Sequence, residues 1–171
     1  MSIKLNNVRL SFPSLFQKAQ FDGADTKYEA TFLLDKVKHA AAIKQIEEAI
    51  AAKIASDLKG AKVPANKLCL RDGDEVEYDG YAGHMTLKAS TKKRPLVLNK
   101  DKSPVTEADG VVYSGCYVNA IVEFWAQNNQ FGKRINATLL GVQFAADGEA
   151  FSSGGSSATV DDFDDLDNEA F

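Results

Sequence analysis

The sequence predicts a mainly β domain with one long helix, an α+β arrangement, followed by a polar tail. Five stretches alternate apolar and polar residues with a period of two, as half-buried strands do: residues 3–12, 27–34, 83–91, 111–126 and 130–144. Residues 36–59 instead repeat their apolar side chains at helical spacing. The chain has 171 residues, enough for one domain over residues 1–150 and a tail over residues 151–171.

The first two strands precede the helix. Residues 3–12 alternate up to Pro13, with a break at Asn6 and Asn7. Residues 27–34 alternate without a break, and their apolar face holds Tyr28, Ala30, Phe32 and Leu34. We expect this face to join the core.

The helix is expected from Lys36 to Lys59, with Asp35 as its N-cap. Its apolar stripe consists of Ile43, Ile46, Ile50, Ile54 and Leu58. Gly60 ends the helix, and Pro64 prevents it from resuming. The stripe is typical of a helix packed on a sheet, and docking of a partner is the alternative.

An acidic segment follows the helix. Between Cys69 and Gly83 lie five carboxylates, Asp72, Asp74, Glu75, Glu77 and Asp79. They do not match a helix-loop-helix calcium site, because Val76 stands where a third oxygen ligand belongs. We interpret the segment as a solvated loop. A metal-dependent nuclease site that uses Asp72 and Asp74 is a less favoured alternative.

Basic side chains gather around the later strands. In residues 83–91, Lys88 lies on the polar face, opposite Met85, Leu87 and Ala89. This strand leads into the densest basic patch of the chain, Lys92, Lys93 and Arg94. Because Pro95 favours an extended backbone at Arg94, that guanidinium can project from the rim of a sheet. Two more cations, Lys133 and Arg134, follow the connection between the last two strands.

The strand at residues 111–126 has an unusual outer face. Its core face is uniformly apolar, with Cys116, Val118, Ala120, Val122 and Phe124. The opposite face carries Tyr117 and Trp125 among polar groups. This pattern predicts an exposed platform for stacking, unless the helix or a loop covers the two rings.

The last twelve residues form an acidic tail. Its charged and aromatic side chains are Asp161, Asp162, Phe163, Asp164, Asp165, Asp167, Glu169 and Phe171. All 20 Lys and Arg precede residue 150, so the net charge of −4 divides into +2 for the body and −6 for the tail. A Ser- and Gly-rich linker at residues 152–158 lets the tail reach back to its own domain. We expect it to compete for any basic groove there.

The sequence carries no recognisable catalytic motif. Its two histidines, His39 and His84, have no zinc-site spacing to a cysteine, and neither a phosphate-binding glycine loop nor a nucleophile elbow is present. We therefore expect no enzymatic activity, cofactor or metal. We expect Cys69 and Cys116 to be free, buried thiols of a reduced compartment. No apolar run is long enough to span a membrane, so we expect a cytoplasmic protein without a membrane partner.

Basic rims beside exposed rings in a mainly β domain are typical of single-stranded nucleic-acid binding, in which cations follow phosphates and rings stack on bases. A five-stranded Greek-key barrel of the OB type offers such a surface. The candidate stacking residues are Tyr113, Tyr117 and Trp125. The candidate phosphate contacts are Lys88, Lys92, Lys93, Arg94, Lys133 and Arg134.

Three segments resemble a known family: Ala89-Ser-Thr-Lys-Lys-Arg-Pro95, Tyr113-Ser-Gly-Cys-Tyr-Val-Asn-Ala120 and Gly132-Lys-Arg-Ile-Asn-Ala-Thr-Leu-Leu-Gly-Val-Gln-Phe144. They are similar to the OB-fold single-stranded DNA-binding proteins of phages. The resemblance implies a non-enzymatic protein that coats single-stranded DNA, whatever its sequence, during phage replication and recombination in the infected bacterial cell. It also implies that an acidic tail ending in an aromatic, here Phe171, docks polymerase and helicase-primase partners.

The sequence leaves several alternatives open. The chain could instead be a protein-interaction module whose acidic tail mimics DNA and occupies the basic groove of a partner. Within the DNA-binding interpretation, homo-oligomer formation, weaker binding of duplex DNA and a preference for DNA over RNA are undecided.

Overall fold

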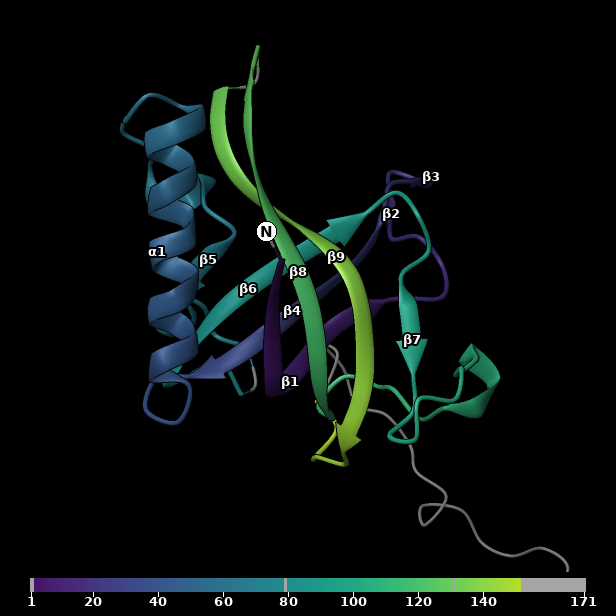
Figure 1. Cartoon of the computed structure of the whole chain (residues 1–171). Helices are drawn as coiled ribbons and strands as arrows, with labels where there is room; N and C mark the ends of the chain where they lie inside the picture. Colours follow the sequence, from purple (N-terminus) through teal and green to yellow (C-terminus); the bar gives the residue numbers. More distant parts are fainter. Residues whose placement is uncertain (1, 79, 131, 152–171) are drawn as a thin grey trace, which may run out of the picture.

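Five strands close into a barrel in the computed structural model, which describes residues 2–78, 80–130 and 132–151, with Phe21 placed by its backbone alone (Figure 1). They are β1 (Ser2–Ser14), β4 (Tyr28–Asp35), β6 (His84–Thr91), β8 (Tyr117–Asn129) and β9 (Gly132–Ala146). Around the barrel the order is β1, β4, β6, β9, β8 and back to β1. The parallel pairing of β6 with β9 closes the ring, and the other four pairings are antiparallel. The expected five-stranded OB-type barrel is confirmed.

Shorter elements extend this ring. β5 (Leu70–Asp72) pairs antiparallel with β6, and β7 (Leu96–Leu98) pairs parallel with β9. β2 (Gln20–Phe21) and β3 (Ala24–Asp25) form a small hairpin within the connection from β1 to β4. Three 3₁₀ turns complete the set: η1 (Ala65–Lys67), η2 (Gly73–Glu75) and η3 (Glu107–Asp109).

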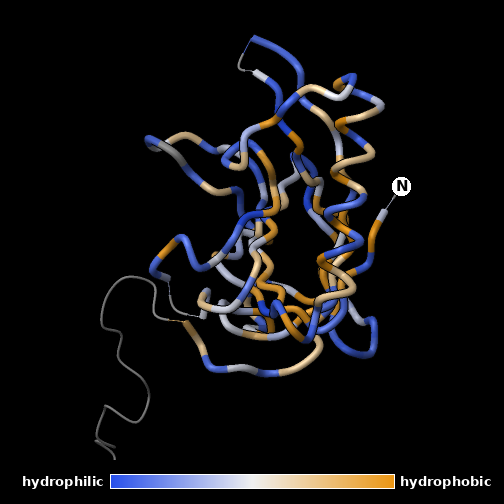
Figure 2. Tube along the Cα trace, turned by 90° about the vertical axis from the view of Figure 1, so that its left-hand side faces the viewer, coloured by the Kyte–Doolittle hydropathy of each residue, from blue (hydrophilic) through white to orange (hydrophobic). Residues whose placement is uncertain are grey.

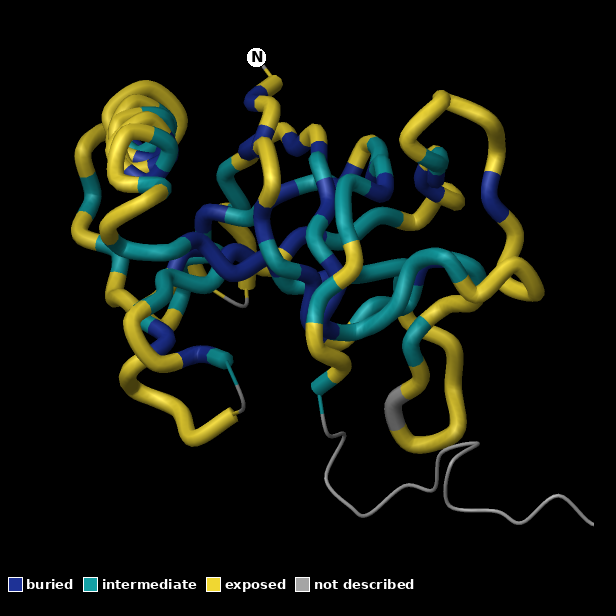
Figure 3. The backbone as a smooth tube through the Cα atoms, turned by 90° about the horizontal axis from the view of Figure 1, so that it is seen from below, coloured by how far each residue is buried: buried dark blue, intermediate teal, exposed yellow. Residues whose placement is uncertain are grey.

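The core fills the barrel with alternate residues of every strand, as the period of two requires. Its largest fully buried side chains include Leu10, Phe32, Leu87, Val122 and Ile135. Figure 2 shows hydrophobic positions concentrated along the strands and the helix, with hydrophilic ones in the loops. In Figure 3 the buried positions lie at the centre of the molecule and the exposed ones at its rim.

The single helix among the described residues, α1 (Ala40–Asp57), packs against β8 and β9 on one side of the barrel (Figure 1). Ile43, Ile46 and Ile50 of the apolar stripe are buried in the common core. Each contributes roughly 1.5–3 kcal/mol through burial. The predicted stripe is confirmed, and α1 supports the barrel without reaching its opposite surface.

The predicted start of the helix was wrong by four residues. The carboxylate of Asp35 accepts hydrogen bonds from the backbone N–H groups of Val37 (2.8 Å) and Lys38 (3.0 Å), so it caps a separate turn before the helix. The N-cap of α1 is His39, which makes no side-chain capping bond. A local capping signal therefore marked the first turn rather than the first helical residue.

The predicted start of the strand at residue 111 was also wrong, because β8 begins at Tyr117. Gly115 has φ 110°, and the N–H of Cys116 bonds to the carbonyl of Tyr113, so these residues turn instead of extending. The predicted break in β1 is confirmed. Asn7 has φ 53°, and the register with β8 shifts between Leu5 and Val8.

The predicted linker and the tail residues Asp161 to Phe171 lie outside the described residues, so the division of the chain at residue 150 stays a prediction. The described chain ends with Phe151, whose ring packs against Gly80. Among the described residues, no helix is long and apolar enough to cross a membrane.

Candidate nucleic-acid interface

One row of residues that point away from the barrel core crosses all five barrel strands, and its last member, Ser11, is covered by Tyr81. Trp125 on β8 pairs with Asn136 on β9, and Lys88 on β6 pairs with Thr31 on β4. The parallel register Ala89 with Ala137 sets Lys88 level with Asn136. Thr31 in turn pairs with Ser11 on β1. With strands about 4.8 Å apart, the four steps from Trp125 to Ser11 span about 19 Å of curved surface.

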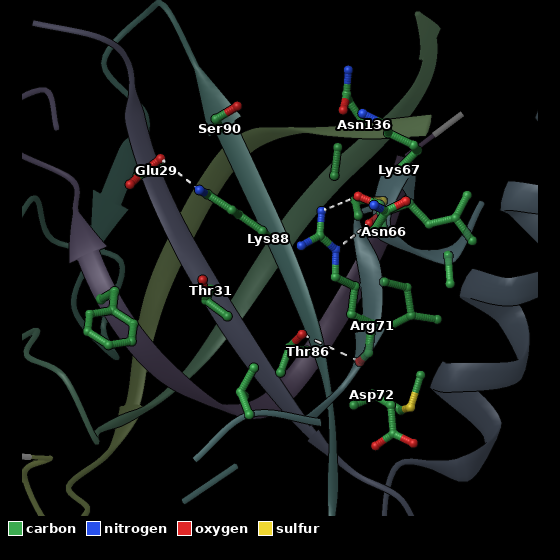
Figure 4. Close-up of a pocket in the computed structure, with 18 of the residues that line it drawn as sticks. Glu29, Thr31, Asn66, Lys67, Arg71, Asp72, Thr86, Lys88, Ser90 and Asn136 are labelled. Carbon is green, nitrogen blue, oxygen red and sulfur yellow. Dashed lines mark hydrogen bonds and ion pairs between the residues drawn. The ribbon is translucent and has the colours of Figure 1, made fainter. Parts of the chain in front are cut away.

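The middle of this row, at Asn136, Lys88 and Thr31, lines a groove of about 1150 Å³ on the outside of the barrel (Figure 4). Five cationic side chains line it: Lys27, Lys67, Arg71, Lys88 and Arg134. Hydroxyl and amide groups lie between them, on Thr31, Thr86, Ser90 and Asn136. Three carboxylates also line the groove: Glu29, paired with Lys88, Asp72, paired with Lys36, and Glu75. The five cations outnumber them, and cations among neutral hydrogen-bonding groups suit a chain of phosphates and sugars.

Two of the groove cations, Arg71 and Lys88, differ in the groups that hold their side chains in place. Arg71 donates from Nε to the carbonyl of Leu68 (3.1 Å) and from Nη2 to the carbonyl of Asn66 (2.7 Å), so neutral acceptors orient its guanidinium. Lys88, with 65% of its side chain exposed, pairs loosely with Glu29 at 3.5 Å. Figure 4 shows Lys88 and Arg71 projecting into the groove from neighbouring strands. The guanidinium of Arg71 is thus fixed, whereas the ammonium of Lys88 can leave Glu29 and bind a phosphate.

Aromatic side chains form the end of the groove that lies near β1, away from Trp125. Phe12, Tyr78 and Tyr81 all line it. The hydroxyl groups of Tyr81 and Ser11 form a buried hydrogen bond of 2.7 Å. Burial also raises the pKa of Tyr81 above its usual value of 10. The phenol therefore stays neutral at physiological pH and anchors the segment that carries Tyr78.

Three of the residues predicted from sequence belong to this surface. Lys88 and Arg134 line the groove, and Trp125 ends the row next to Asn136. Trp125 is 39% exposed, so neither the helix nor a loop covers it. That alternative is excluded for Trp125.

The other predicted cations lie elsewhere. Lys92, Lys93 and Arg94 follow the end of β6, where the guanidinium of Arg94 lies 5.8 Å from the centre of the Phe16 ring. Lys133 has the strand parity of the buried Ile135, so it projects on the opposite face of the β8–β9 hairpin from Arg134. The structure does not bring these four residues into the groove, and their contact with DNA stays a prediction.

The tyrosines predicted to stack lie away from the groove, Tyr117 at the start of β8 and Tyr113 in the turn before it. Tyr117 is eight residues from Trp125, about 27 Å along the strand. The guanidinium of Arg9 lies over it, 5.7 Å from its centre, and over Phe151 at 4.1 Å. The hydroxyl of Tyr113 donates to Asp147 at 2.9 Å. These contacts fasten the end of β9, and stacking by either tyrosine stays untested.

Sequence reasoning missed Phe12, Lys67, Arg71, Tyr78 and Asn136. The signal for Asn136 was present, since it follows Arg134 on the polar face of its strand. Arg71 and Tyr78 fall within the segment interpreted only as a solvated loop.

The acidic segment has a structural role in the described chain. Asp72 and Asp74 both bind the ammonium of Lys36, each at 2.7 Å. Over residues 2–78, 80–130 and 132–151, no three His, Cys, Asp or Glu side chains are grouped closely enough to hold a metal ion. Cys69 lines the groove, but burial raises the pKa of its thiol to about 12, so it stays protonated and is a poor nucleophile.

The sequence as a whole matches one protein family. The model of that family, described as "Enterobacter phage Enc34, ssDNA-binding protein", covers residues 1–171. This chain belongs to the Enc34 single-stranded DNA-binding protein family. The phage-family resemblance carried by the three sequence segments is thereby confirmed.

Similar proteins of known sequence or structure match nearly the whole chain. "Putative protein p50" of Acyrthosiphon pisum secondary endosymbiont phage 1 is 48% identical over 176 residues, 97% of this chain and 94% of that protein. The single-stranded DNA-binding protein of bacteriophage Enc34 matches with a TM-score of 0.79 and 34% identity, over 91% of this chain and 87% of its own. Its complex with single-stranded DNA matches equally well, over 88% and 89% of the two chains.

A more distant neighbour shows the fold alone. The single-stranded DNA-binding protein gp2.5 of bacteriophage T7 has a TM-score of 0.51 and 7% identity, over 92% of this chain and 98% of that one. This likeness extends to the fold and to nothing more specific.

Proposed function

We propose that this protein binds single-stranded DNA without regard to sequence, along the row from Trp125 to Ser11. The supporting observation is that one lateral row joins an exposed indole, a cationic groove and an aromatic cluster. The Enc34 relative, which was solved in complex with single-stranded DNA, has the same fold and 34% identity. A strand in this position crosses the barrel strands instead of running parallel to them.

The chemistry of the row explains both affinity and lack of sequence preference. Arg71, Lys88 and Arg134 attract phosphates, and neutral hydroxyls and amides bond to the sugar-phosphate chain. Trp125 offers an exposed ring face, and stacking contributes about 1–3 kcal/mol per base for any of the four bases. None of these groups requires a particular base edge, so we expect binding to single strands of any sequence. Such a protein can coat the single strands that phage replication and recombination expose.

The acidic tail is proposed to compete with DNA for the groove. The body carries +2 and the last twelve residues carry −6, so the tail is attracted to the body. The described chain ends at Phe151, which packs against Gly80, two residues from Tyr78 in the groove wall. Once DNA displaces it, the tail with Phe163 and Phe171 becomes free to recruit replication proteins such as a polymerase or helicase-primase.

Titration of a labelled oligo-dT, followed by fluorescence anisotropy and by the emission of Trp125, tests this proposal. We expect saturable binding, altered emission and weaker binding of a duplex of equal length. The double variant Lys88→Ala, Arg134→Ala should lower the salt slope by roughly 1.4, because each phosphate contact contributes about 0.7. Lys44→Ala, on the solvent face of α1, is the matched control.

A chain ended after Phe151 tests the tail in the same titration. Without its six carboxylates the groove has no internal competitor, so we expect tighter binding than for the full chain. Equal or weaker binding would refute competition by the tail. Absence of oligo-dT binding by both chains would refute DNA binding itself and favour the interaction-module alternative.

A further inference from the structure

An exposed aromatic cluster lies at the β1 end of the row. The rings of Phe12 and Tyr78, and those of Tyr78 and Tyr81, contact edge to face at 5.2 Å between centres. Phe12 is 48% exposed and Tyr78 56% exposed, while Tyr81 behind them is buried. Clustered large rings that face solvent inside a groove are typical of a ligand surface.

The backbone directs Phe12 into the groove. In a regular strand, the alternation that buries Leu10 would also turn Phe12 into the core. Instead Phe12 has φ 47°, a left-handed conformation, and the pairing of β1 with β4 shifts register between Ser11 and Ser14. A residue other than glycine rarely adopts such a conformation, because its side chain crowds the backbone. A strained backbone conformation at Phe12 therefore places its ring outside the barrel core.

The cluster continues the row at the end opposite Trp125. Ser11, the last member of the row, shares its hydrogen bond with Tyr81, whose ring contacts both exposed rings. Phe12 and Tyr78 thus stand on a fixed support, one strand beyond Thr31 and two beyond Lys88. A strand that follows the row from Trp125 past Lys88 arrives at these rings.

We propose that Phe12 and Tyr78 form a second base-binding subsite, which takes one unpaired nucleobase against their exposed ring faces. The subsite rests on the proposed function and adds to it. A base within a duplex has both faces covered by its neighbours, so only an unpaired base can lie here. The subsite therefore favours single strands over duplex, whereas the groove cations attract both.

Binding of oligo-dT compared with an abasic deoxyribose-phosphate oligomer of the same length tests the subsite. Tyr78→Ala and Phe12→Leu should each bind oligo-dT roughly 5- to 150-fold more weakly than wild type, the loss expected for one stacked base. Both should bind the abasic oligomer as wild type does. Tyr78→Phe, which keeps the ring, should retain binding of oligo-dT.

The control variant is Leu96→Ala, which truncates an exposed apolar side chain on β7 outside the groove lining. It should bind both oligomers as wild type does, and melting curves verify the fold of every variant. As a second readout, an oligomer containing 5-iodouracil should form photo-crosslinks to the peptides with Phe12 or Tyr78 in the wild-type protein.

The outcomes separate the subsite from the function on which it rests. If wild type fails to bind oligo-dT, the proposed function fails. If wild type binds while Tyr78→Ala and Phe12→Leu bind oligo-dT equally well, the subsite is refuted and the function stands. An equal loss on the abasic oligomer, or crosslinks confined to other peptides, would also refute stacking at these rings.

Discussion

Glu29 is one of three carboxylates that line the groove, with Asp72 and Glu75, and its charge opposes DNA. Its carboxylate lies 3.5 Å from the ammonium of Lys88 and is itself part of the groove lining. A phosphate that approaches Lys88 must displace this partner and is also repelled by it. The pair thus sets Lys88 in place but lowers its attraction for DNA.

Glu29→Gln should therefore strengthen binding of oligo-dT by about fivefold, since a unit charge at 4 Å across water contributes ~1 kcal/mol. The amide keeps the shape of the side chain and removes the charge. Anisotropy titration at low salt measures the effect, and Glu47→Gln on the exposed face of α1 is the control. Weaker binding by Glu29→Gln would mean that the carboxylate holds Lys88 in the productive position.

Sequence predicted those site residues whose placement follows from strand alternation alone. Lys88, Arg134 and Trp125 lie on the polar faces of their strands, and regular pleating carries them to the outer surface. Phe12 was missed because alternation assigns it to the core, and only the φ of 47° reverses it. Tyr78 belongs to a loop, whose path depends on contacts far apart in the sequence.

At the scale of elements, one lysine joins the segment after β5 to the end of β4. Lys36 binds Asp72 and Asp74, and these bonds hold the pKa of both carboxyl groups below the usual 3.8. The same carboxylates raise the pKa of Lys36 above 10.5. This segment carries Tyr78 and Tyr81, and Asp72 itself lines the groove, so the ion pairs stabilise the groove wall.

The ion pairs predict a defined pH dependence. Lowered carboxyl pKa values stabilise the fold above pH 3.8, and this contribution is lost as the pH falls through the folded values. Lys36→Met should therefore melt at a lower temperature than wild type near neutral pH, with a gap that closes as the pH drops below 3.8. Calorimetry over a pH series measures the gap, with Lys44→Met as the control. A gap independent of pH would contradict an electrostatic origin.

Element types were predicted better than element ends. Alternation and the isoleucine stripe identified all five barrel strands and α1, because burial of one face enforces these periods. The ends at Ala40 and Tyr117 were missed, since a capped turn and a glycine turn interrupt patterns that look continuous in sequence.

At the scale of the molecule, closure of the barrel creates the interface. The row exists only because β6 pairs with β9, which brings Lys88 beside Asn136 from segments about 50 residues apart. The closing pair is parallel and distant in sequence, so strand patterns alone did not reveal it. α1 contributes nothing to the groove lining and leaves this outer face accessible.

Lysine footprinting by mass spectrometry, with and without saturating oligo-dT, tests the central claim most directly. A strand along the row should protect Lys88 and Lys67 from acetylation and leave Lys44, on the solvent face of α1, as reactive as before. The same spectra decide the predictions for Lys92, Lys93 and Lys133. If bound oligo-dT left Lys88 and Lys67 fully reactive, the strand would have to follow another path, and the account would be contradicted.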